Sequence, residues 1–208
     1  MMKTNNVKEL ILYQMNKTSK NTIYTVNDFY DFGTKSAVKT ALFRLTNEGL
    51  IHRIYDGYYV IPYYSELIHE YSYPTAEELA TKIAQKFVWN ITPYGDNALN
   101  QTGLSSQVPK ICEYLSDGPY REYEYRNRVI KFKHTSNRNI SKYSLPLSLI
   151  IQSVKEVGKE NITDDEINKL VLFSKKYVYE DLIKDTKSLP EWIYRVLVEI
   201  DKGVKNDR

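Results

Sequence analysis

The sequence predicts an α+β fold with two domains, residues 1–64 and 65–208, and three observations lead to this prediction. The apolar fraction of 42% is sufficient for packed cores. Near the N-terminus, an amphipathic helix over 34–48 is followed at once by two short aromatic and β-branched runs around Asp56-Gly57, a typical hairpin turn. Further on, stretches within 108–134 have the composition of strands, and helical periodicity returns after them. We therefore expect a helix-and-hairpin domain, then a mixed domain of helices and a small antiparallel sheet.

Three short elements are expected before the central helix. Apolar residues at helical spacing predict a first helix over Asn6–Met15. The run Ile23–Thr25 has the composition of a brief strand. A short helix over Val26–Phe32 follows, because Thr25 and Asp28 stand where a capping pair is placed.

The central helix over 34–48 and the hairpin after it form the core of the first domain. The apolar face of this helix is made of Val38, Ala41, Leu42 and Leu45. Thr34 or Ser36 can cap its start, and Gly49 is suited to end it because glycine tolerates a left-handed backbone. Leu50–Tyr55 and Tyr58–Ile61 are the expected hairpin strands. The order helix, strand, helix, turn, helix, hairpin is that of a winged helix-turn-helix, in which the brief strand can pair with the wing.

The opposite face of the central helix is polar and partly cationic. Its residues are Lys35, Ser36, Lys39, Thr40, Phe43, Arg44 and Asn47. Such groups suit phosphates and base edges in a major groove. The candidate DNA-binding residues are therefore Lys35, Ser36, Lys39, Thr40 and Arg44 on the helix, with His52, Arg53 and Tyr55 on the wing. The alternative is a winged helix that serves as a protein-interaction module, docking a partner without specific DNA binding.

The second domain is expected to begin after a linker over 63–73. A Thr-x-x-Glu capping box at Thr75 opens a helix to about Trp89, and a similar box begins at Thr163. A turn is predicted over 91–95 and a short helix over 96–102. The expected strands are 108–115, 120–125 and 128–134, and the later helices are 145–157, 164–179 and 190–202.

A second concentration of basic charge lies in residues 121–142, where seven Lys and Arg stand against two Glu. Its leading candidates are Arg121, Arg126, Arg128 and Lys131. They would form a face for nucleic acid or an acidic partner. The alternative, given equal weight, is a solvated sheet face in which charge protects an edge strand.

Several classes of function find no support. The single Cys112 allows no disulfide within the chain, and no apolar run approaches the roughly 18 residues of a membrane span, so we expect a cytoplasmic protein. The three histidines are far apart and outside metal-ligand spacings. No nucleophile stands beside a base. We expect neither an enzyme nor a bound metal or cofactor.

Two stretches carry a family resemblance. The first is Ala41-Leu42-x-x-Leu45 with Gly49-Leu50-Ile51-x-Arg53, Gly57-Tyr58-Tyr59 and Pro62, and the second runs from Ile91-Thr92-Pro93-Tyr94-Gly95 to Gly103-Leu104-Ser105. In these stretches the chain resembles AbiEi-type antitoxins of type IV toxin–antitoxin systems.

The resemblance implies two activities. The winged helix would bind inverted repeats in its own promoter and repress the operon, as a monomer or as two copies on paired sites. The C-terminal domain would counter a nucleotidyltransferase toxin, without needing a stable complex with it. By this resemblance the helix and wing candidates become DNA contacts, and the four basic candidates of 121–142 become candidates for antitoxicity or for extra DNA contact.

Overall fold

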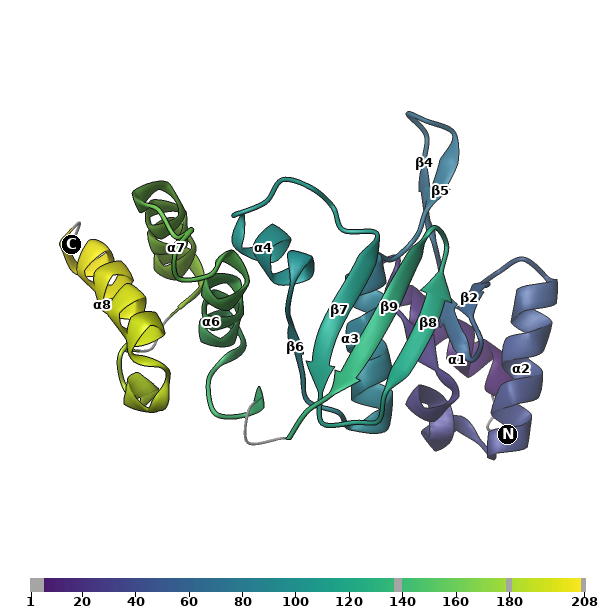
Figure 1. Cartoon of the computed structure of the whole chain (residues 1–208). Coiled ribbons are helices and arrows are strands. Elements are labelled where there is room, and N and C mark those ends of the chain that lie inside the picture. The colour runs from purple at the N-terminus through teal and green to yellow at the C-terminus, as the bar shows by residue number, and fades with distance from the viewer. Residues whose placement is uncertain (1–5, 137–139, 179–180, 207–208) are drawn as a thin grey trace. The chain divides into compact units, whose positions relative to one another are not determined.

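A computed structural model describes residues 6–136, 140–178 and 181–206, and it has a mixed α+β fold, as predicted. The chain forms two compact units, Met1–Phe87 and Val88–Arg208 (Figure 1). The predicted boundary after residue 64 lies inside the first unit. The helix after that point belongs to this unit, where it pairs Lys82 with Asp28 at 3.0 Å.

The first unit begins with three helical elements and a small sheet. Its helices are α1 (Val7–Asn16), the 3₁₀ helix η1 (Val26–Phe32) and α2 (Lys35–Asn47). The strands β1 (Tyr24–Thr25), β2 (His52–Tyr55) and β3 (Tyr58–Val60) form an antiparallel sheet in the order β1-β3-β2. The brief first strand therefore pairs with the hairpin, as expected.

Local interactions explain the bounds of α2 and of the hairpin. The Thr34 hydroxyl accepts a hydrogen bond from the Ala37 backbone N–H at 3.3 Å, so Thr34 caps the helix. After the helix, Gly49 has a left-handed backbone with φ of 71°. Gly57 has φ of 77° in the two-residue loop between β2 and β3, as a tight hairpin requires.

The core of the first unit is formed by the inner faces of these elements. Its buried residues are Ile11, Met15, Tyr24, Phe29, Val38, Ala41, Leu42, Leu45 and Ile51. All four apolar α2 residues predicted for the inner face are among them. Burial of that face directs the polar face of α2 outward.

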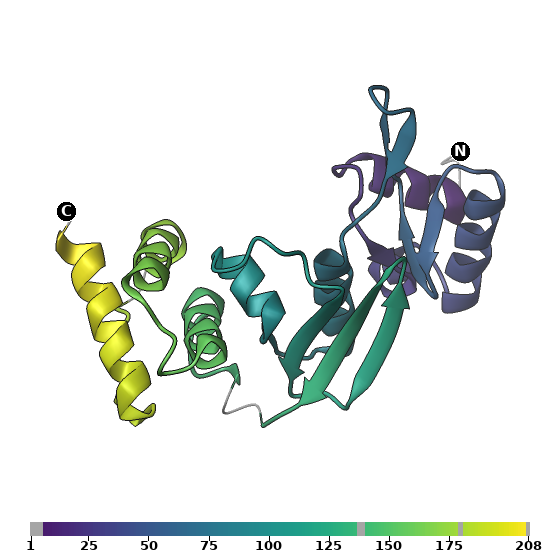
Figure 2. The same cartoon turned by 45° about the horizontal axis from the view of Figure 1, so that its top comes forward.

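The segment predicted as a linker is a second hairpin. Strands β4 (Tyr63–Ser65) and β5 (Glu70–Ser72) pair antiparallel, and they project from the first unit in Figures 1 and 2. Tyr64 and Tyr71 face each other across the pair with ring centroids 5.0 Å apart, a cross-strand contact that favours pairing. Helix α3 (Ala76–Phe87) follows, and the predicted capping box is present: Glu78 accepts from the Thr75 N–H at 2.6 Å.

The second unit contains a four-stranded sheet in the order β6-β7-β9-β8. Its strands are β6 (Ile91–Pro93), β7 (Ile111–Ser116), β8 (Arg121–Tyr125) and β9 (Arg128–His134). The prediction of an antiparallel sheet is wrong for one pair, because β9 lies between β8 and β7 and runs parallel to β7. The predicted turn over 91–95 is also partly wrong, since β6 pairs with β7.

Helices complete the second unit. They are α4 (Asp96–Thr102), α6 (Leu145–Val157), α7 (Asp164–Tyr177), the 3₁₀ helix η2 (Thr186–Ser188) and α8 (Glu191–Asn206). Helices α6, α7 and α8 share one apolar core, which includes Ile150, Leu170 and Leu197. The predicted end of α7 at residue 179 lies outside the described residues. None of the helices in the described ranges is long and apolar enough to cross a membrane.

Candidate functional site

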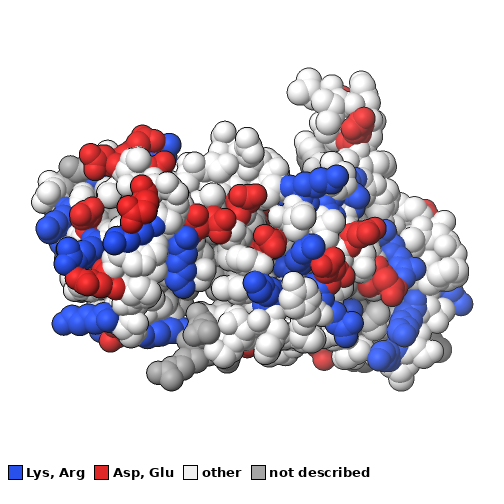
Figure 3. Space-filling view, viewed as in Figure 1, with Lys and Arg blue, Asp and Glu red and all other residues white. Residues whose placement is uncertain are grey.

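The outward face of α2 is the strongest candidate for a functional surface. All seven residues predicted for this face are exposed. Figure 3 shows Lys and Arg side chains at the surface of this part of the chain, on the right of the view. The Thr40 hydroxyl donates to the Ser36 carbonyl at 3.0 Å, within the helix. The sequence thus correctly separates the inner and outer faces of this helix.

A hollow of about 430 Å³ lies beside this face, within the first unit. We call it the basic hollow. Four cationic side chains line it: Lys35 and Lys39 of α2, Arg53 of β2 and Lys86 of α3. Asp56, in the β2–β3 turn, also lines it and forms an ion pair with Arg53. Among its described lining residues, four cations therefore face a single carboxylate, and the hollow is suited to an anion.

Lys86 is the member of the basic hollow that the sequence analysis missed. Its Nζ lies 4.5 Å from the ring centroid of Tyr58, within the range of a cation–π contact. Burial lowers the pKa of Lys86, and the charge of Asp56 opposes this shift. One signal was present in the sequence: Lys82 and Lys86 stand four residues apart, so they share a face of the predicted helix.

The other two wing candidates lie elsewhere. Neighbouring residues of a strand point to opposite faces, so His52 does not share the side of Arg53. His52 instead shares a hydrogen bond of 2.9 Å between its Nδ1 and the Tyr73 hydroxyl, and its ring packs 5.0 Å from that of Tyr71. Tyr55 packs its ring 6.2 Å from that of Tyr58. Of the three wing candidates, only Arg53 lines the basic hollow.

The four basic candidates of the second unit are not gathered on one face. Lys131 forms an ion pair of 3.0 Å with Glu122 on the neighbouring strand. Arg121 lies opposite Phe132, on the other side of the sheet from Lys131. The Arg128 Nε donates to the Pro109 carbonyl at 3.0 Å.

The fourth candidate, Arg126, stands in the β8–β9 turn with φ of 56°. Figure 3 shows acidic side chains among the basic ones. Arg138, also in the basic run, lies outside the described residues. This arrangement fits the alternative of a solvated sheet face in which charge protects an edge strand.

Groups suited to catalysis are sparse in the described part of the chain. No set of three or more His, Cys, Asp or Glu there could hold a metal ion. Tyr94 donates to Glu113 Oε1 at 3.1 Å, and burial, together with that carboxylate, raises the pKa of Tyr94 to about 12. Its hydroxyl therefore stays protonated near neutral pH. Cys112 is buried.

Comparison with known proteins identifies a family. A family model described as a family of unknown function, DUF6088, matches residues 10–182, which include both compact units in large part. No curated protein matches the chain.

Proposed function

The chain belongs to the DUF6088 family, and we propose that its first unit is a winged helix-turn-helix that binds double-stranded DNA. In this proposal α2 enters the major groove and the β2–β3 hairpin is the wing. Support comes from the element order, from the pairing of β1 with the hairpin and from the polar outer face of α2.

One observation carries the proposal: four cations from three elements line the basic hollow. Lys35 and Lys39 come from the helix that would enter the groove, Arg53 from the wing and Lys86 from α3. Phosphate contacts from several elements fix the orientation of a protein on the duplex, whereas the outer residues of α2 would read base edges. Lys86 joins the proposed phosphate contacts, and His52 moves from a DNA contact to a support for the second hairpin.

The full proposal is a cytoplasmic, non-enzymatic repressor of its own promoter that also acts as an antitoxin. This proposal follows from the resemblance of the sequence to AbiEi-type antitoxins. Two copies would occupy an inverted repeat, one on each half-site. The second unit would counter a nucleotidyltransferase toxin, with or without a stable complex.

A promoter fusion tests the regulatory part. The upstream region of the gene drives a reporter in a host without the gene, and the chain is supplied in trans. The proposal predicts repression that is lost when the inverted repeats are scrambled. Unchanged reporter output on expression of the chain would contradict it. Rescue of growth against a nucleotidyltransferase toxin of a type IV system, expressed from an inducible promoter, tests the antitoxin part separately.

Arg44→Ala is expected to relax base specificity. Arg44 is exposed on the outer face of α2, and an arginine side chain can donate two hydrogen bonds to the major-groove edge of one guanine. Its loss should cost about 1–3 kcal/mol at one position of the site and little at the others. Competition with a panel of single-base operator variants measures this. An equal loss on every duplex would instead make Arg44 a phosphate contact.

Lys86→Met is expected to weaken binding to all duplexes by a similar factor. The methionine keeps an unbranched apolar side chain but removes the charge that lies over the Tyr58 ring and lines the basic hollow. If Lys86 contacts one phosphate, the slope of log Kd against log salt falls by about 0.9. Lys20→Met, which removes an exposed charge from the same unit outside the hollow, is the matched control. Equal slopes for the two variants would remove Lys86 from the interface.

A second candidate function has an observation in its favour. The β4–β5 hairpin carries two exposed apolar residues at its tip, Leu67 with 92% and Ile68 with 61% of its surface accessible. Exposed apolar groups are typical of protein-binding surfaces. In this alternative the first unit docks a protein, and a stable co-purifying partner without any DNA shift would favour it.

A further inference from the structure

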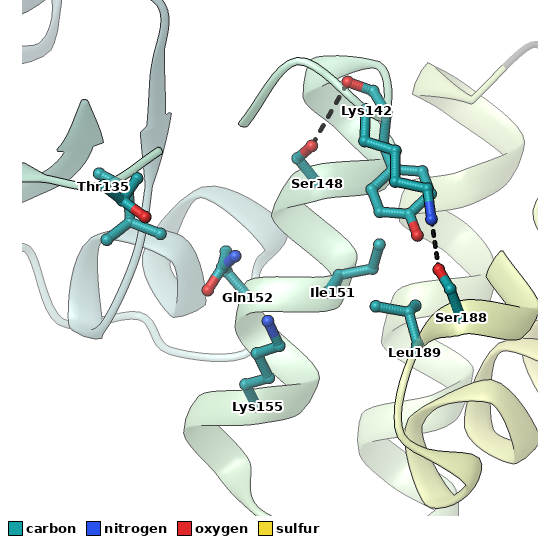
Figure 4. A pocket seen from close by; sticks show the side chains of 10 residues that line it. Thr135, Lys142, Ser148, Ile151, Gln152, Lys155, Ser188 and Leu189 are labelled. Carbon is teal, nitrogen blue, oxygen red and sulfur yellow. Dashed lines mark hydrogen bonds between the residues drawn. The ribbon is translucent and has the colours of Figure 1, made fainter. Parts of the chain in front are cut away.

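The second unit contains a hollow of about 500 Å³ that the proposed DNA-binding function does not use. We call it the α6 hollow, because Ser148, Ile151, Gln152 and Lys155 of α6 line one side (Figure 4). The rest of the lining comes from the end of the sheet, from the segment before α6 and from η2. All of these elements belong to the second unit.

The charge of the α6 hollow is positive. Lys142, before α6, and Lys155, near the end of α6, both line it, and none of its described lining residues is acidic. Lys142 is held in place, since its Nζ donates to the Ser188 hydroxyl and lies 5.1 Å from the Tyr143 ring centroid. Figure 4 shows the two ammonium groups on different elements of the lining. Two ammonium groups without a carboxylate in the lining favour an anionic ligand.

The remaining lining of the α6 hollow contains both polar and apolar groups. Hydroxyls of Thr135, Ser148 and Ser188 supply hydrogen-bonding groups. The buried Ile151 and the half-buried Leu189 supply apolar surface. A ligand that contacts the lysines and hydroxyls as well as the apolar surface has a charged end and a less polar body. The volume lies within the range of about 300–1,000 Å³ that is usual for small-molecule sites.

We propose that the α6 hollow binds a small phosphorylated molecule of mononucleotide size. Lys142, which Ser188 positions, binds the phosphoryl group, and Lys155 adds a second positive charge to the same hollow. The body of the ligand packs on Ile151 and Leu189. This site lies outside the first unit, so it stands whether or not that unit binds DNA.

Calorimetric titration of the full chain tests this with three probes: AMP, inorganic phosphate and adenosine. AMP is expected to bind and adenosine is not, because adenosine lacks the anion. Phosphate binding as tight as AMP would show that the site reads the phosphoryl group alone. Tighter binding of AMP would show that the apolar wall contributes. The first result would overturn the placing of a ligand body on Ile151 and Leu189, whereas the second supports the whole proposal.

The lysine variants make the test specific. Lys142→Gln is expected to weaken AMP binding by about tenfold or more, as the loss of a hydrogen bond to a charged group does. Lys155→Gln is expected to weaken it by a smaller factor, because it removes only a nearby charge. Lys159→Gln, an exposed lysine of the same unit outside the hollow, is the matched control. Both target lysines are exposed, so the folded state should persist, which circular dichroism checks. No binding of AMP or phosphate at millimolar concentration, or binding that both variants leave unchanged, would overturn the proposal.

Discussion

Replacing Lys35, Lys39 and Arg53 together with glutamine is expected to weaken DNA binding by about a hundredfold or more at physiological salt. All three side chains line the basic hollow, where they would meet phosphates. The loss should be similar for every duplex, since phosphate contacts carry no direct sequence information. The slope of log Kd against log salt should fall by about three, because each neutralised phosphate accounts for about one. Fluorescence anisotropy across a salt series measures both quantities.

Two further variants separate this local effect from a general loss of charge. Lys17→Gln with Lys20→Gln removes the same charge as Lys35→Gln with Lys39→Gln, from lysines of the same unit outside the hollow. Asp56→Asn releases Arg53 from its ion pair and removes the single carboxylate, so it should tighten binding. If both lysine pairs weaken binding equally, the basic hollow has no special role.

Phe29→Ala is expected to lower the free energy of unfolding of the first unit by about 3–5 kcal/mol, because it leaves a cavity in the core. The Phe29 ring is fully buried and stacks on Tyr24 at 5.2 Å and on Phe32 at 6.1 Å between centroids. Phe29 lies in the same core as the inner face of α2, so its loss should also disturb the position of this helix. Urea unfolding followed by far-UV circular dichroism measures the change.

Phe43→Ala is the matched control for that prediction. Phe43 lies on the outer face of α2 with 63% of its surface exposed, so its removal should change stability by no more than about 0.5 kcal/mol. Similar destabilisation by the two variants would contradict the assignment of the inner and outer faces of this unit.

The features that the sequence predicts well depend on near neighbours in the chain. Thr34 caps α2 through a residue three positions away, and the Thr75–Glu78 pair does the same for α3. Asp56-Gly57 forms its turn from two adjacent residues. In each case a few consecutive residues contain the whole interaction, so their identity predicts the geometry.

The features that the sequence does not predict depend on distant segments or lack a turn signal. The β4–β5 hairpin bends without Gly, Pro or Asn, and His69 supplies the left-handed backbone with φ of 51°. Strands β8 and β9 form an antiparallel pair, and either of them could in principle lie next to β7. The parallel pairing of β9 with β7 is therefore not encoded in the local sequence pattern. Lys86 reaches the basic hollow only because α3 packs beside the earlier helices and the hairpin of the same unit.

One of the two candidate surfaces is predicted well from the sequence and the other is not. Helical periodicity identifies the outer face of α2, so Lys35 and Lys39 are predicted correctly as exposed neighbours. The basic run of the second unit suggests a continuous basic face only when charges are counted along the chain. Alternation along a strand separates Arg121 from Lys131, and cross-strand pairing places Glu122 beside Lys131.

The most direct test of the central proposal is binding of the purified chain to a labelled duplex from its own upstream region, beside a scrambled duplex of equal length. The measurement runs across a salt series. The proposal predicts tighter binding to the upstream duplex and a steep loss with salt, whose slope gives the number of phosphate contacts. Equal and weak binding to both duplexes would contradict it and would favour a first unit that docks a protein.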